Sequence, residues 1–102
     1  MKDIEEEIGK EFRAGGHFYD MRKMNFVEIE AVRAIETIRH IDPQKYNSNE
    51  KCKLVLLIWR LPLYALWWRD RCVQMGADRI KFEAYVRELE RVVEEKLKGL
   101  LS

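Results

Sequence analysis

The chain has 102 residues, of which 47% are hydrophobic and 36% are charged, and its formal net charge is +1. This apolar content excludes a disordered chain, and the length favours a single domain, residues 1–102, with a core of modest size. A net charge near zero excludes long-range attraction of the whole protein to nucleic acid. Few glycines and prolines among many strong helix formers predict an all-α fold, a compact bundle of four to five helices.

The first residues, MKDIEEEIGKEF, are acidic and amphipathic, which fits neither a signal peptide nor a transit peptide. Ile4, Ile8 and Phe12 recur every four residues and predict a helix over residues 2–14, ended by Gly15 and Gly16. Residues 17–23 are ambiguous between a loop and a single helical turn.

A second helix is predicted over residues 26–41, with Asn25 as its N-cap and Glu28 completing a capping-box pattern. Asp42 and Pro43 stop this helix and favour a single turn after it. The apolar residues of the helix recur every three positions and are Phe26, Ile29, Val32, Ile35, Ile38 and Ile41.

The most apolar stretch is LVLLIWRLPLYALWWRDR, residues 54–71, which contains all three tryptophans. Arg60 and Pro62 interrupt it, so it is not a membrane span. It predicts two helices, residues 49–61 and 62–75, with Asn47 or Ser48 capping the first and Pro62 in the first turn of the second. We expect most of its side chains to form the central core. The alternative is that Trp67, Trp68 and the neighbouring arginines also face a partner.

Asp78 is the predicted cap of a last helix, residues 79–98. Its apolar positions recur at steps of three and four, which is typical of packing against other helices. Three i,i+4 pairs are expected on its exposed side: Glu83–Arg87, Arg91–Glu95 and Glu94–Lys98.

No catalytic motif is present in the sequence. His17 and His40 are interpreted as surface or capping residues, and glutamates beside Lys or Arg stay ionised, unlike a tuned acid. Cys52 and Cys72 do not have zinc-ligand spacing, and we expect both to be small core or boundary residues of an intracellular, cytoplasmic protein. We expect no enzyme, no catalytic residue, no cofactor, no metal site, no small-molecule substrate and no membrane partner.

Residues 51–81 have a net charge of +5, between segments with net charges of −3 and −1. If one helix continued through this region, Arg60, Tyr64, Trp68 and Arg71 would lie on one side and form a face for stacking and phosphate binding. The interpretation we favour is that Trp68 packs inward and the arginine stems cover apolar surface. The nucleic-acid-binding candidates are Arg60, Arg69, Arg71, Arg79 and Lys81.

The second half of the chain, from YNSNEKCKLVLLIWRLPLYALWWRDR to RIKFEAYVREL, resembles the Gag capsid domain of long-terminal-repeat retrotransposons, an Arc-like lobe, over residues 26–97. Leu61, Ala65 and Trp68 match the family's Leu, Ala and first Trp. The final aromatic spacing of three and then four residues is reproduced by Phe82, Tyr85 and Leu89. The sequence departs from the family where Leu63 replaces a glycine, Arg69 a second tryptophan and Phe82 a tryptophan.

The resemblance implies a capsid lobe that self-associates, in a virion or capsid particle if not free in the cytoplasm. We therefore expect a non-enzymatic assembly protein, capsid-like or nucleocapsid-like, that forms homo-oligomers through helix faces. The alternative is a small nucleic-acid-binding helical protein using residues 51–81, and an adaptor bundle within a larger complex is a third interpretation. The expected core and assembly residues are Trp59, Leu61, Ala65, Trp67, Trp68, Phe82, Tyr85 and Leu89.

Overall fold

The computed structural model describes residues 2–102, which form six α-helices and one short 3₁₀ helix. No strand occurs within these residues, so the predicted all-α class is confirmed. The helices are α1 (Lys2–Lys10), α2 (His17–Arg22), α3 (Glu28–Arg39), η1 (Pro43–Lys45), α4 (Ser48–Ile58), α5 (Leu61–Gln74) and α6 (Arg79–Leu100).

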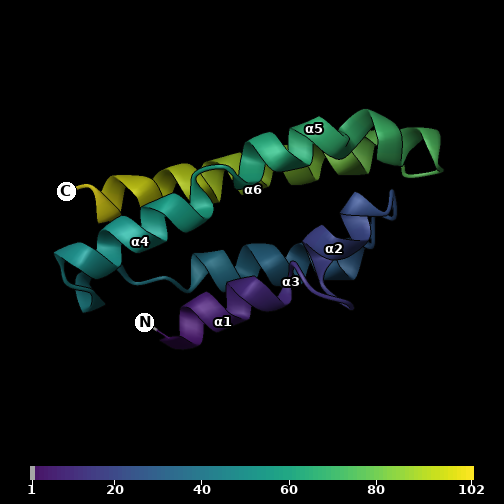
Figure 1. The fold of residues 1–102 in the computed structure, drawn as a ribbon. Helices are drawn as coiled ribbons and strands as arrows, with labels where there is room; N and C mark the ends of the chain where they lie inside the picture. The colour runs from purple at the N-terminus through teal and green to yellow at the C-terminus, as the bar shows by residue number, and fades with distance from the viewer. Residues whose placement is uncertain (1) are drawn as a thin grey trace.

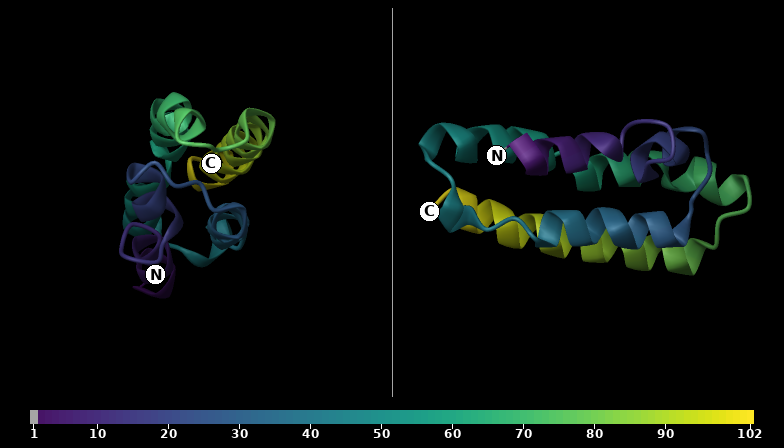
Figure 2. Two further views of the ribbon diagram at one scale, coloured as in Figure 1. Left: turned by 90° about the vertical axis from the view of Figure 1, so that its right-hand side faces the viewer. Right: turned by 90° about the horizontal axis from the view of Figure 1, so that it is seen from below.

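The helices form an elongated bundle of two layers, 42 × 24 × 18 Å (Figure 1). One layer contains α1, α2 and α3, and the other contains α4, α5 and α6. Along the bundle α4 and α5 follow one another in a line, here called the α4–α5 rod (Figure 1), and seen end-on α5 lies beside α6 with α3 diagonally across from it (Figure 2). Both termini lie at the same end of the bundle.

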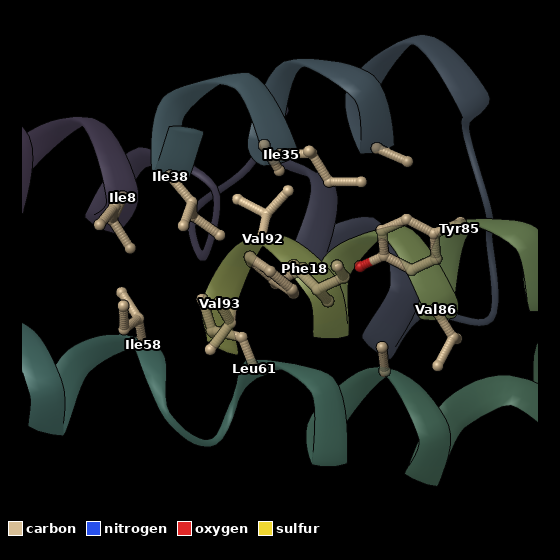
Figure 3. Close-up of a cluster of buried hydrophobic side chains, with 14 of the residues drawn as sticks. Ile8, Phe18, Ile35, Ile38, Ile58, Leu61, Tyr85, Val86, Val92 and Val93 are labelled. Carbon is tan, nitrogen blue, oxygen red and sulfur yellow. The ribbon is translucent and has the colours of Figure 1, made fainter. Parts of the chain in front are cut away.

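The core lies between the two layers and is built around α6, which packs against α3, α4, α5 and η1. Side chains from the other helices converge on it, as Figure 3 shows for Ile8, Phe18, Ile38 and Ile58. Burial of these apolar side chains is the main source of stability in a bundle of this size.

Three predicted helix starts are confirmed. Asn47 caps α4 and forms a reciprocal capping box with Glu50, and the Asp78 carboxylate accepts from the Lys81 backbone N–H at the start of α6. Asp42 accepts from the Gln44 backbone N–H at the predicted single turn. Each cap satisfies a backbone donor that has no partner inside its helix.

The predicted first helix is wrong in its length, because α1 ends at Lys10 and not at residue 14. Glu11 causes the early end. Its backbone carbonyl accepts from the N–H groups of Phe18 and Tyr19, and its carboxylate accepts from the His17 backbone N–H at 2.9 Å. These bonds draw α2 back against the end of α1, and Phe12, which was predicted to continue the apolar stripe, is 37% exposed.

The predicted start of α3 is also wrong, because the helix begins at Glu28 without a side-chain cap from Asn25. Ile29 and Val32, predicted on the apolar stripe, are exposed. Residues three apart are separated by about 300° around an α-helix, so a step-of-three stripe drifts around the axis. Ile35, Ile38 and Ile41 of the predicted stripe are buried, and within α3 the buried residues that accompany them are Ala31 and Ala34.

Two smaller expectations are corrected. Glu83 pairs with Arg79 at 3.6 Å and not with Arg87, whereas the other two predicted i,i+4 pairs on α6 are present. Both cysteines are free thiols; Cys72 is buried as expected, but Cys52 is exposed because it lies on the outer side of α4.

Candidate interaction face

An apolar face covers the solvent side of the α4–α5 rod. Leu56 is 70% exposed, Leu63 60% and Trp67 71%, and Trp59 and Leu66 are each a little over 40% exposed. We call these five residues the outer face. Single exposed apolar side chains are common, but here five lie within twelve residues, and three of them, Trp59, Leu63 and Trp67, line one groove.

The helical pitch explains why these residues point outward. Leu54, Ile58, Leu61 and Ala65 recur at steps of four, three and four, and all are fully or almost fully buried. Because Pro62 is in the first turn of α5, the helical path continues across the junction and keeps this buried stripe in line. The remaining apolar residues, Leu56 and Leu63 among them, are left on the opposite side.

The expectation that most side chains of residues 54–71 form the core is therefore corrected for the five outer-face residues. Trp59 and Trp67 were among the predicted core and assembly residues, whereas Leu56, Leu63 and Leu66 were not. The sequence does contain a signal for these residues, because residues 54–71 have apolar side chains on every side of the predicted helices. A rod that packs one side against α6 can bury only one stripe of them, so the others must be exposed.

A shallow groove of about 480 Å³ runs along this surface and is lined by Trp59, Arg60, Leu63, Tyr64, Trp67 and Trp68. The guanidinium of Arg60 lies 5.1 Å from the centre of the Trp59 ring, and that of Arg71 lies 5.0 Å from the centre of Trp68. These are cation–π distances, so both arginines cover aromatic surface while remaining exposed. The groove thus presents aromatic rings together with one lining cation, Arg60, and Arg71 lies on the ring of Trp68.

The five predicted nucleic-acid-binding residues do not form one surface. Arg69 and Arg79 both contact Asp70, at 3.3 and 3.7 Å, and Lys81 contacts Glu28 on α3 at 3.6 Å. Of the five, Arg60 lies on the exposed Trp59 ring and Arg71 on the half-buried Trp68 ring. Two carboxylates outside residues 51–81, Glu83 and Glu28, pair with Arg79 and Lys81 and so partly compensate the +5 net charge of this segment.

The core and assembly candidates include exposed, half-buried and buried residues. Trp67 belongs to the outer face, and Trp68 is half-buried beside Tyr64, with 6.4 Å between the ring centres. Trp59 is 41% exposed at the α4–α5 junction. The other candidates are buried core residues: Leu61, Ala65, Phe82, Tyr85 and Leu89.

A second polar feature joins Arg33 on α3, whose side chain is half exposed, to the buried residues Glu11 and His17. Arg33 donates two hydrogen bonds to the Glu11 carboxylate, at 2.9 and 2.8 Å. Burial raises the pKa of Glu11, but the bonds from Arg33 and from the His17 backbone outweigh it and the pKa is lowered. His17, interpreted from the sequence as a surface or capping residue, has no exposed surface, and its Nε2 is joined to Tyr85 Oη by a 2.5 Å hydrogen bond. The His17 and Tyr85 side chains of this cluster are buried, whereas Arg33 reaches the surface.

A hollow of about 620 Å³ beside this cluster is lined by Glu7, Lys10, Arg13 and Arg33 among others. In the part of the chain that the structure describes, no group of three or more His, Cys, Asp or Glu side chains is placed to hold a metal ion. None of the helices in residues 2–102 has both the length and the apolarity that a membrane crossing requires.

The fold defines the class of protein, an all-α helical bundle. Comparisons of the chain with protein-family models, curated proteins and solved structures find no match. The resemblance to the Gag capsid domain therefore rests on the sequence motifs of residues 26–97 alone.

Proposed function

We propose that this protein is a non-enzymatic assembly module that self-associates, as a capsid lobe does, and that the outer face of the α4–α5 rod is its contact surface. The observation that carries the proposal is the exposure of five large apolar side chains within twelve residues of one rod: Leu56, Trp59, Leu63, Leu66 and Trp67. Contact with a partner removes such apolar surface from water, which lowers the free energy of the associated state. Tryptophan is also the residue most often found at the energetic centre of protein interfaces.

The apolar content of the face favours a protein partner over nucleic acid. Three of its five residues are aliphatic, and leucine offers no stacking surface to a base. The cations nearest to it, Arg60 and Arg71, lie on tryptophan rings.

The test is the mass of the protein in solution as a function of concentration, measured by sedimentation or light scattering. Trp67→Ala removes the most exposed aromatic side chain of the outer face and is expected to weaken self-association at least tenfold, the effect of losing about 1.4 kcal/mol. Ile29→Ala is the matched control, because Ile29 is 78% exposed on α3, diagonally across the bundle. The control is expected to associate like the wild type.

A wild type that stays monomeric at high concentration would overturn the proposal, as would a Trp67→Ala variant that associates normally. The second candidate, binding of single-stranded nucleic acid, is favoured by the two arginines beside the aromatic groove. It would replace self-association if the monomer bound oligonucleotides with an affinity that fell steeply as salt was added.

A further inference from the structure

The hollow of about 620 Å³ lies where the loop after α1 meets α3, and we call it the α1–α3 hollow. Three cationic side chains line it: Lys10 at the end of α1, Arg13 in the loop and Arg33 on α3. The hollow belongs to the layer of α1 and α3, and no outer-face residue lines it. An inference drawn from it is therefore independent of the proposed self-association.

Arg33 is held in a fixed orientation at this hollow. Its Nε and Nη2 donate to the two oxygens of Glu11 at 2.9 and 2.8 Å, and Nη2 also donates to the Gly15 carbonyl oxygen at 3.1 Å. Glu11 is itself fixed, because its side chain is only 6% exposed and accepts from the His17 backbone N–H. A guanidinium that is already ordered loses less conformational entropy when it binds a further group.

The third nitrogen of the Arg33 guanidinium remains available. Hydrogen bonds to Glu11 and Gly15 occupy Nε and Nη2. Among the described residues, Nη1 makes no hydrogen bond or ion pair, and the Arg33 side chain is 52% exposed. Because Arg33 lines the hollow, it can donate to a ligand there while it keeps its bonds to Glu11.

The loop after α1 places two more cations beside the hollow. The Arg13 backbone N–H donates to the Lys10 carbonyl oxygen at 3.2 Å, and the Gly16 backbone N–H donates to the Arg13 carbonyl oxygen at 2.8 Å. Both side chains are exposed, and neither takes part in an ion pair of the described residues. Because they meet Arg33 only in the folded chain, the sequence alone indicated no small-molecule site.

Two carboxylates line the same hollow. Glu11 is neutralised by Arg33, whereas Glu7 has no ion pair among the described residues and opposes an anion. With three cations against two carboxylates, the lining has a net charge of +1. The hydrogen bond and charge of Glu11 raise the pKa of Arg33, and the charges of Glu30 and Asp20 add to this shift, but neither of these two lines the hollow. The balance favours an anionic ligand.

We propose that the α1–α3 hollow is a binding site for the phosphate group of a small molecule, held by Arg33 Nη1, Arg13 and Lys10. A phosphate ester has a charge of about −2 and three acceptor oxygens, so it can accept from all three side chains. A carboxylate has half that charge and fewer oxygens. Guanidinium groups also match the geometry of phosphate oxygens. The volume of the hollow is in the range of small-molecule sites, which leaves room for the rest of the molecule.

The probe is phenyl phosphate, added to the full chain and followed through the backbone amide signals in NMR. Saturable shifts are expected at Gly15 and Thr37, which line the hollow, and none at the outer face. Benzoate has the same ring with a carboxylate in place of the phosphate and is expected to bind several-fold more weakly. Vesicles containing phosphatidate present the phosphate on a lipid headgroup. Binding to these vesicles without binding of phenyl phosphate would overturn the assignment to a small molecule.

Substitutions in the lining test the three contacts. Lys10→Ala and Arg13→Ala are each expected to raise the dissociation constant for phenyl phosphate about threefold or more, because each removes one charge-assisted contact at an exposed position. Glu7→Gln is expected to lower it, because the opposing charge is removed. The matched controls Lys53→Ala and Arg87→Ala remove exposed cations outside the hollow and are expected to leave it unchanged.

Far-UV circular dichroism shows whether each variant is folded, and the exposure of Lys10 and Arg13 favours a native fold in both. Equal affinities of the wild type, Lys10→Ala and Arg13→Ala would overturn the proposal. Weaker binding by Lys53→Ala and Arg87→Ala to the same extent would also overturn it, because the attraction would then belong to the whole surface. Shifts that do not saturate at Gly15 and Thr37 would have the same meaning.

Discussion

His17 is a buried ionisable residue whose surroundings favour the neutral form of its imidazole ring. The side chain has no exposed surface, and burial lowers its pKa from 6.5 to about 4; Arg33 adds to this shift, and Glu11 and Asp20 partly oppose it. Its Nδ1 has no hydrogen-bond partner among the described residues. The unfolded chain therefore binds a proton on His17 more readily than the folded protein does.

This difference predicts a loss of stability on acidification. The contribution of neutral His17 is fully present above pH 6.5 and is lost as the pH falls from 6.5 towards 4, because the unfolded state takes up the proton first. The shift corresponds to a change on the order of 3 kcal/mol in the free energy of unfolding. His17→Gln does not titrate, so the stability difference between variant and wild type should change by about that amount between pH 7 and pH 4. Urea unfolding at several pH values measures it, and parallel pH profiles would contradict the argument.

Glu30 gives a control of the opposite sign. Its pKa is raised from 4.5 to about 7, first by burial and then by a hydrogen bond with Asp20 and the charge of Asp20. The folded state therefore binds this proton more tightly, and stability is lost as the pH rises from 4.5 through 7. Glu30→Gln is expected to remove that loss, so its profile should separate from the wild type at high pH and not at low pH.

At the level of single elements, the glycines show how closely the helices approach one another. A Cβ on Gly16 would lie 2.3 Å from the Lys10 carbonyl oxygen, so the turn between α1 and α2 has no room for a side chain. Gly99 lies near the end of α6, where a Cβ would be 2.7 Å from Cγ of Pro43 on η1. Gly9 in α1 has only an ordinary contact, with an Arg13 side-chain nitrogen at 3.9 Å.

Gly9→Ala and Gly99→Ala therefore form a matched pair with opposite expected effects. Alanine is favoured over glycine within a helix by about 1 kcal/mol, and Gly9→Ala should raise the free energy of unfolding by roughly 0.5–1 kcal/mol. In Gly99→Ala the same gain is opposed by the clash with the proline ring, and a net loss of about 1 kcal/mol is expected. Chemical denaturation of both variants measures this. Stabilisation by Gly99→Ala would mean that η1 moves away from α6 at little cost.

At the level of the whole molecule, α6 connects the two layers. It packs against α3 in one layer and against α4 and α5 in the other, and Leu89 at its middle is completely buried. Neither layer can keep its apolar side covered without α6. The bundle should therefore unfold as one unit.

Leu89→Ala tests this dependence. Removing a fully buried leucine side chain is expected to cost about 2–5 kcal/mol of stability. The three tryptophans lie in the α4–α5 rod, so their fluorescence reports on that layer, whereas far-UV circular dichroism reports on all helices. The two signals should have the same transition midpoint in the wild type and in the variant. Separate midpoints would show that the layers unfold independently.

Local signals in the sequence are sufficient for several features of this protein. The caps at Asp42, Asn47 and Asp78 and the position of Pro62 are encoded within a few residues and were predicted from them. The helix ends at Lys10 and Glu28 were not, because they depend on bonds that Glu11 makes to residues in α2 and on the packing of α3. Those partners are brought together only by the fold.

The sequence by itself determined an all-helical chain with one strongly apolar segment, because helix propensity and periodicity are local properties. Which side of that segment is covered was decided only by the tertiary structure. Buried and exposed leucines of this segment both lie among apolar and aromatic residues in the sequence. Their exposed fractions differ because α6 packs against one side of the α4–α5 rod and not against the other. Leu61 and Leu63 are two residues apart, yet the first is core and the second is on the outer face.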